Sequence, residues 1–442
     1  MTPRPGIADR LARLLRHPTV SGSGAPFADF EASLRELYPL LHEHLELERI
    51  GEPGLLYRWP GSDAAASPVV LMAHIDVVPV DERDGWSHPP FGGVVRDGWV
   101  FGRGALDDKG PLIVILEAVE NLLAEGFRPT GDVYLSFGGD EETGGTVAKQ
   151  IAQTLHDRGI HPWLVIDEGG AVVDPPLPGI SRSAAMIGVG EKGLLTLRLV
   201  ARGEGGHASA PPPVTEVARI SRAVARLRPT MFPPRTPAAT VRMLQLVGEH
   251  ADRPWMRTVY RVLAALPRVT ARLLAAGGGE TAALVRTTIA PTMLSGGTAA
   301  NVLPSRAEAV LNLRVAIGET VDGAIARVRR TIRDRRIAIE VEEANEPSPE
   351  SSTAGPQFAL LAAALADSHP DAVAIPYVMM AATDSRHFHR FFPAVFRFAP
   401  LGMSDAQRAS IHGVDERVEV SELERGERFH RSLLTRLQEP RP

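Results

Sequence analysis

Apolar runs and helical patterns alternate along the first part of the chain. Three short runs have the length and composition of buried strands, at 68–72, 132–137 and 163–166. Apolar residues recur with helical spacing around them, at 7–16, 27–45, 146–158 and in the segment that follows Pro111. This alternation predicts an α/β fold with a mostly parallel sheet, in which ligands bind beyond the carboxyl ends of the strands.

The pattern changes near residue 188. A half-exposed strand is expected at 194–202, a strand, glycine-rich turn and strand at 292–315, and helices at 214–228 and 319–335, before the strand-like run at 337–343. The order strand, helix, strand, strand, helix, strand predicts a small α+β insertion of the ferredoxin-like kind. We therefore expect three segments: a catalytic domain over 1–188, an inserted domain over 189–347, and the rest of the catalytic domain over 348–442.

Two features of the inserted region allow more than one interpretation. The helical stretch 254–276, broken by Pro267, could pack on the core or surface, or could form an apolar lid. The segment from Gly188 to Gly193 matches G-x-G-x-x-G, but the residues after it alternate like a strand and do not open a helix. A dinucleotide site is therefore not expected.

Charged residues stand where the predicted strands end. The strand at 132–137 leads into Asp140, Glu141 and Glu142, flanked by glycines, and crowded carboxylates raise one another's pKa. Their repulsion can be offset by solvent, as in an exposed loop tip, or by a cation.

The same pattern recurs at other strand ends. His74 and Asp76 follow the first strand, two residues apart and on one face, so the carboxylate can orient the imidazole or the pair can simply end the strand. Asp107 and Asp108 precede a helix and could cap it. Asp167, with Glu168, follows the strand at 163–166.

Composition narrows the class of protein. The chain has 442 residues, which favours two domains. Its net charge of −5 gives no electrostatic reason to expect that it binds nucleic acid. It contains no cysteine, which excludes disulfides and thiolate chemistry. We expect no secretory signal, no membrane span and a cytoplasmic protein.

Taken in order, these motifs resemble the co-catalytic dizinc amidohydrolases, a family that includes aminoacylase-1, carboxypeptidase S, acetylornithine deacetylase and succinyl-diaminopimelate desuccinylase. The segments GRGALDDKG, GGDEETGG, IDEGG, TAANVLP, TDSRHF and IHGVDERV look most like the carboxypeptidase S branch. The likeness covers nearly the whole chain. The chain differs from the family pattern in the alanines of AATDSRHF and in a long segment around 250–285. Both differences concern the identity of the substrate.

The resemblance implies a zinc-exopeptidase-like catalytic domain that holds two divalent ions. His74 and Asp167 would bind one ion, Glu142 and His412 the other, and Asp107 would bridge them. Nitrogen and oxygen ligands favour Zn²⁺, with Mn²⁺ or Co²⁺ as alternatives.

The other implied roles concern catalysis and the substrate. Glu141 resembles the general base that takes a proton from water and returns it to the leaving amine, and Asp76 orients His74. His207 and Asn301 resemble residues that stabilise the oxyanion and the substrate, with His207 often supplied by the partner in a homodimer. Arg386 and Arg314 would pair with a substrate carboxylate. The resemblance also implies a cis peptide bond between Asp107 and Asp108, whereas Asp108, Glu168, Lys192 and His387 are interpreted as local capping or packing residues.

The resulting hypothesis is a dinuclear-metal hydrolase that cleaves the amide bond of N-acyl amino acids or removes C-terminal residues from small peptides. One alternative is a di- or tripeptidase that requires a free substrate amine. Another is a non-catalytic metal-binding protein on the same scaffold. That alternative would require the loss of the base or of a metal ligand, and all six positions, the five ligands and the base, carry the expected residue.

Overall fold

The computed structural model describes residues 3–22, 24–175 and 177–438. Its largest sheet has ten strands in the order β1-β2-β6-β3-β7-β17-β9-β8-β18, with β16 paired to β9. The four strands β6, β3, β7 and β17 at its centre run parallel, and antiparallel pairs lie toward the edges. The strands of this sheet are β1 (Glu46–Arg49), β2 (Leu55–Trp59), β3 (Val69–His74), β6 (Val133–Gly138), β7 (Leu164–Asp167), β8 (Val172–Val173), β9 (Ser183–Glu191), β16 (Ala372–Met379), β17 (Val395–Arg397) and β18 (Gly402–Met403).

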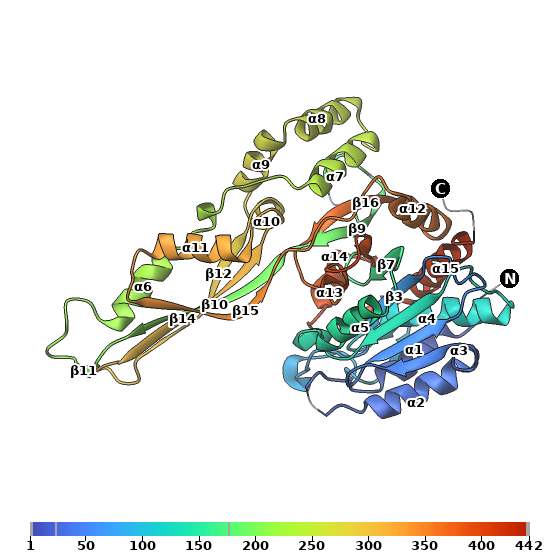
Figure 1. Ribbon diagram of the computed structural model, residues 1–442, viewed down its shortest axis with the longest axis horizontal. Coiled ribbons are helices and arrows are strands. Elements are labelled where there is room, and N and C mark those ends of the chain that lie inside the picture. Colours follow the sequence, from blue (N-terminus) through green and yellow to red (C-terminus); the bar gives the residue numbers. More distant parts are fainter. Residues whose placement is uncertain (1–2, 23, 176, 439–442) are drawn as a thin grey trace.

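Helices cover both faces of this sheet (Figure 1). Side chains alternate between the faces with the strand period of two: Leu71 joins the main core, whereas its neighbours Val70 and Met72 join the core on the opposite face. The helices of this domain are α1 (Ile7–Leu15), α2 (Phe27–Leu37), α3 (Pro39–His44), α4 (Lys109–Ala124), α5 (Thr146–Asp157), α12 (Pro356–Ser368), α13 (Ser385–Phe388), α14 (Asp405–Ser410) and α15 (Val420–Arg436), with short 3₁₀ turns η1 (Glu82–Asp84) and η2 (Glu141–Thr143). A separate small sheet contains β4 (Val94–Arg96), β5 (Trp99–Phe101) and β19 (Arg417–Glu419).

The inserted region forms a second sheet with its own core. Its four antiparallel strands have the order β12-β14-β10-β15, and helices α6 and α11 pack on it. This is the predicted strand, helix, strand, strand, helix, strand order. The elements are β10 (Gly193–Arg202), α6 (Glu216–Arg226), η3 (Pro229–Met231), β12 (Thr288–Gly296), β14 (Arg306–Val315), α11 (Val321–Ile332) and β15 (Ile337–Asn345), with a small ladder of β11 (Gly206–His207) and β13 (Val302–Leu303).

A further group of helices lies between α6 and β12 in the sequence: α7 (Ala238–Glu249), α8 (Pro254–Ala265), α9 (Pro267–Ala276) and α10 (Gly279–Ala283). Met243 and Val247 of α7 and Tyr260 of α8 are buried in the main core of the large sheet, not in the core of the four-stranded sheet. The segment boundaries at 189 and 347 stay predictions.

Two differences from the sequence-based elements have local causes. The helix expected over 27–45 is two helices, because Pro39 disfavours the helical conformation of Tyr38, which has φ −129° and ψ 64°. Strand β9 was not predicted, because its glycine-rich end around Gly188 lacks a strand pattern. The break at Pro267 is confirmed by the separate helices α8 and α9.

Candidate metal centre

Three of the central parallel strands, β3, β6 and β7, end at one edge of the large sheet, and each is followed or ended there by a predicted site residue. His74 is the last residue of β3, the acidic turn follows β6, and Asp167 is the last residue of β7. Because β3 is parallel to both β6 and β7, these ends are neighbours. The structure therefore brings these predicted residues together at one edge of the sheet.

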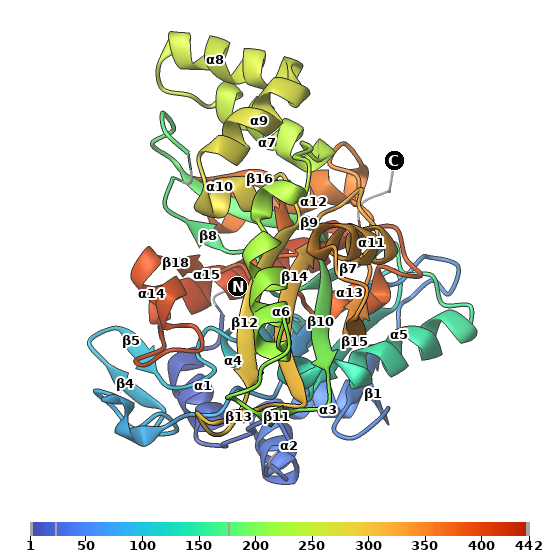
Figure 2. The same cartoon turned by 90° about the vertical axis from the view of Figure 1, so that its left-hand side faces the viewer.

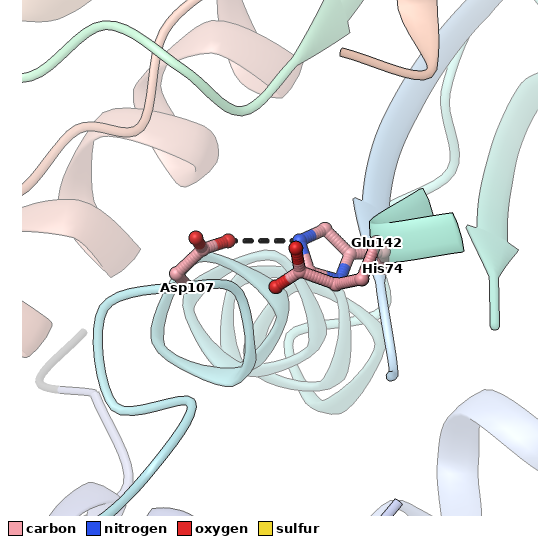
Figure 3. A group of neighbouring side chains, drawn as sticks. All are labelled: His74, Asp107 and Glu142. Carbon is pink, nitrogen blue, oxygen red and sulfur yellow. Dashed lines mark hydrogen bonds and ion pairs between the residues drawn. The ribbon is translucent and has the colours of Figure 1, made fainter. Parts of the chain in front are cut away.

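Asp107 lies between two imidazoles. Its Oδ1 is 2.9 Å from Nε2 of His74, and its Oδ2 is 3.0 Å from Nε2 of His412. Nε2 of His412 is also 3.2 Å from Oε1 of Glu142. Figure 3 shows His74, Asp107 and Glu142 pointing toward a common centre. One carboxylate that faces a separate histidine with each oxygen has the arrangement required of a bridging ligand.

Asp76 holds the other side of the His74 ring. Nδ1 of His74 lies 3.3 Å from Oδ1 of Asp76 and 3.0 Å from its backbone oxygen, and both residues are buried. Burial opposes protonation of His74, but its bonds to Asp107 and Asp76 outweigh this effect and raise its pKa well above the usual value. The bond to Asp76 leaves Nε2 directed at Asp107, as expected for an oriented metal ligand.

The acidic turn is held by the same carboxylate. Asp76 accepts hydrogen bonds from the backbone N–H groups of Glu141, at 3.3 Å, and Glu142, at 3.2 Å. Burial raises the pKa of Glu141 well above the usual range, and the nearby charges of Asp384, Asp107 and Glu142 add to this rise. The structure thus brings the predicted base beside the predicted ligands.

The donor set fits divalent cations. His74, Asp107 and Glu142 each place a ligand atom within 4.8 Å of the others. Hydrogen bonds to Asp107 and Glu142 raise the pKa of His412 to about 10. Carboxylates that stabilise a positive charge, next to imidazole nitrogens, match the oxygen and nitrogen coordination of a catalytic metal site.

Two adjacent acids, Asp167 and Glu168, are candidates for the metal ligand that the sequence assigned to Asp167. Its Oδ2 accepts the backbone N–H of Ser385 at 2.7 Å. Glu168, interpreted from the sequence as a packing residue, has its pKa raised well above normal by burial and then by Asp107, the strongest of the neighbouring charges. Successive residues of an extended chain point in opposite directions, and this alternation is the sequence feature that could have drawn attention to Glu168.

Glu416 is a positioning residue that sequence reasoning missed. It is fully buried and accepts hydrogen bonds from Nη1 of Arg103 (2.5 Å) and from the backbone N–H groups of Leu106 (2.8 Å) and Asp107 (3.1 Å). It therefore fixes the loop that carries Asp107 to the segment that carries His412. The peptide bond between Asp107 and Asp108 is cis, as the resemblance implied.

Asp108 does not cap α4 with its side chain, although capping was one interpretation of this residue. Its Oδ2 instead accepts the backbone N–H of His74 at 3.0 Å.

Of the two predicted substrate-binding arginines, Arg386 lies beside Glu141. Arg386 donates to the backbone oxygens of Thr383 (2.7 Å) and Gly144 (2.9 Å), and its Nη1 is 3.9 Å from Oε1 of Glu141. Burial lowers the pKa of Arg314, and the charge of Arg386 is among those that act on it.

His207 and Asn301 lie together but away from the cluster. The backbone N–H of Ala208 donates to the oxygen of Asn301 at 3.0 Å, and β11 pairs with β13. Both residues are exposed, and β11, which carries His207, lies at the end of the four-stranded sheet that is farthest from the large sheet (Figure 1). Within one chain, the structure does not bring them to the metal ligands.

Comparison with known proteins agrees with this geometry. The model of Peptidase family M20/M25/M40 matches residues 70–436, and the chain belongs to this family. It is 35% identical over 427 residues to "Probable carboxypeptidase S-like 2" of Dictyostelium discoideum, covering 94% of this chain and 82% of that protein. It is 33% identical over 438 residues to "N-fatty-acyl-amino acid synthase/hydrolase PM20D1" of Mus musculus, covering 96% and 86%.

Solved structures share the fold. The M20 family metallo-carboxypeptidase Sso-CP2 from Sulfolobus solfataricus superposes with a TM-score of 0.75 at 18% identity, covering 98% of this chain and 99% of that one. Human carnosine dipeptidase 1 gives a TM-score of 0.69 at 16% identity, with coverage of 98% and 95%. The predicted family and α/β fold are confirmed, and the protein is a metal-dependent amidohydrolase. In the described residues, no helix is long and apolar enough to cross a bilayer.

Proposed function

We propose that this protein hydrolyses the amide bond of N-acyl amino acids, or releases C-terminal residues from small peptides, with two divalent metal ions. The observation that carries the proposal is the position of Asp107 between His74 and His412, with Glu141 beside them. The names of the relatives, carboxypeptidase S-like 2 and N-fatty-acyl-amino acid synthase/hydrolase, support this substrate class.

The proposed ligands are His74, Asp107, Glu142, Asp167 and His412, with Zn²⁺ as the preferred ion because only nitrogen and oxygen donors are present. When bound, two such ions lower the pKa of water and polarise an amide carbonyl. Asp76 keeps His74 in one tautomer, which leaves Nε2 free for coordination.

Glu141 acts as the proton carrier in this proposal. Its carboxylate takes a proton from the attacking water and gives it to the nitrogen of the scissile amide as the C–N bond breaks. Asp76 holds the turn that carries Glu141, through the backbone N–H groups of Glu141 and Glu142. This backbone attachment restricts Glu141 without using its side chain.

Arg386 and Arg314 are proposed to bind the free carboxylate of the substrate. Arg386 is already fixed by two backbone oxygens, so its remaining N–H groups are presented in one orientation. A carboxylate on the product amino acid is common to N-acyl amino acids and to C-terminal peptide residues, which is why both belong to the proposed class.

We also propose that a homodimer completes the site. His207 and Asn301 are exposed and remote from their own metal ligands, so a second subunit could supply them to stabilise the oxyanion and the substrate.

A substrate panel tests the function. The purified enzyme, supplied with Zn²⁺, Mn²⁺ or Co²⁺ in separate assays, is given N-acyl amino acids of short and long acyl chain, and dipeptides with free or acylated amines. We expect release of the amino acid from substrates with a blocked amine. Activity confined to substrates with a free amine would instead identify a di- or tripeptidase, and no metal-dependent hydrolysis of any member would contradict the proposal.

A further inference from the structure

Helices α8 and α9 expose a row of large apolar side chains. Trp255, Val259, Val262 and Leu266 recur at i, i+4, i+7 and i+11, which places them on one face of α8. Trp255 is 59% exposed and Leu266 50% exposed. Leu266 joins the two helices, and the row continues on α9 with Val269 and Leu273, of which Leu273 is 57% exposed.

This exposed row is not the face by which the helices pack on the rest of the molecule. In α8 the buried residues are Tyr260 and Ala264, and the hydroxyl of Tyr260 donates to the backbone oxygen of Pro178 at 2.6 Å. In α9 the buried residues are Thr270 and Ala271. Helix α8 therefore has one apolar face in the core and a second one in solvent. Both views place α8 at the outer limit of the molecule (Figures 1 and 2).

Within helices α8 and α9 the charged residues have a single sign. Residues 253–279 contain five arginines and no acidic residue, and all five arginines are exposed: Arg253, Arg257, Arg261, Arg268 and Arg272. Arg257 and Arg261 are four residues apart on α8, as Arg268 and Arg272 are on α9, so each helix carries its cations along one side.

We propose that the α8–α9 surface, defined by these apolar and arginine residues, docks on the surface of an anionic phospholipid membrane. A helix with exposed tryptophan and leucine, flanked by arginines, is the composition that lies in a membrane interface. The apolar side chains would enter the headgroup region while the arginines bind lipid phosphates. A second copy of this chain suits the surface less well, because a symmetric contact would oppose arginines with arginines, and Glu249, which lies beside Arg257 and Arg261, already pairs with Arg242.

Vesicle binding tests the proposal with the full-length protein. Phosphatidylcholine vesicles with and without phosphatidylglycerol are floated with the wild type and with the triple variant Trp255→Gln/Leu266→Gln/Leu273→Gln. A matched control changes three equally exposed side chains of the four-stranded sheet, Met293→Gln/Leu294→Gln/Val341→Gln. We expect binding that needs phosphatidylglycerol and weakens with salt, a fall of at least ~10-fold in the triple variant, and wild-type binding in the control.

Fluorescence gives a second measurement that does not depend on the folding of the triple variant. Trp255 is the tryptophan among the exposed large apolar residues, so vesicles should shift the emission of the wild type to the blue. Trp255→Phe should keep vesicle binding and lose this shift. Absence of binding by the wild type, equal binding by the triple variant, or loss of self-association instead of vesicle binding in the triple variant would each overturn the proposal.

Discussion

The carboxylate of Asp76 accepts a hydrogen bond from the backbone N–H of Glu142 at 3.2 Å. The same carboxylate orients His74 and accepts the N–H of Glu141. One buried acid thus aligns a proposed ligand with the turn that carries the proposed base. This relationship makes Asp76 a positioning residue whose loss should affect metal binding and turnover together.

For Asp76→Ala we expect metal affinity to fall by about 10–100-fold, with a parallel fall in kcat, because both His74 and the acidic turn lose their support. Competition with a chelator measures the affinity, and a steady-state assay measures kcat. Asp76→Asn keeps an oxygen for one N–H and should be affected less. An unchanged metal affinity in Asp76→Ala would remove the proposed link between Asp76 and the ligands.

A second prediction concerns Glu416, which anchors the Asp107 loop. Glu416→Ala leaves the buried Arg103 guanidinium and several backbone N–H groups without their acceptor, so the free energy of unfolding should fall by about 3–5 kcal/mol. Denaturant unfolding checks this value. The control is Asp415→Ala, whose carboxylate binds exposed Ser87 and should cost about 1 kcal/mol or less. Equal stability of the two variants would show that the Glu416 network does not support the fold.

A third prediction separates Asp167 from Glu168. Oδ2 of Asp167 already accepts the N–H of Ser385, whereas Asp107 is the strongest charge near Glu168. Asp167 is the proposed ligand, and a carboxylate ligand is commonly held by a hydrogen bond of this kind. We expect Asp167→Asn to release more metal than Glu168→Gln, as measured by the metal content of the purified proteins. Greater loss in Glu168→Gln would replace Asp167 with Glu168 in the proposed ligand set.

Much of the fold followed from local patterns. The apolar runs at 68–72, 132–137 and 163–166 became adjacent parallel strands, and their polar ends meet because parallel strands finish at the same edge. His74 and Asp107 could be predicted because each belongs to a motif whose order along the chain is itself informative.

Other parts depend on contacts that no local pattern contains. Glu416 lies more than 300 residues after the Asp107 loop, to which it is joined by the hydrogen bond from the backbone N–H of Leu106. Nothing in the sequence around position 416 indicates this contact. Whether Asp167 or Glu168 faces the other metal ligands depends on the backbone conformation at the end of β7. Helix α7 was not predicted, although its residues Met243 and Val247 are buried in the main core.

The proposed dimer gives a fourth prediction. His207→Ala should keep metal and fold but lose about 10²–10³ in rate, because oxyanion stabilisation is lost. If His207 acts in the partner's site, mixing His207→Ala with Glu141→Ala under conditions of subunit exchange creates one intact site in each mixed dimer. Random pairing should then restore about a quarter of wild-type activity. No recovery despite proven exchange would place the action of His207 within its own chain or outside catalysis.

The central claim is that Glu141 carries the proton while Asp107 bridges two ions. The most direct measurement is the metal content and turnover of Glu141→Ala beside Asp107→Ala. We predict that Glu141→Ala retains both ions and loses at least about 10² in kcat, whereas Asp107→Ala loses both ions together. Loss of metal or near-normal kcat in Glu141→Ala, or full retention of one ion in Asp107→Ala, would contradict this account.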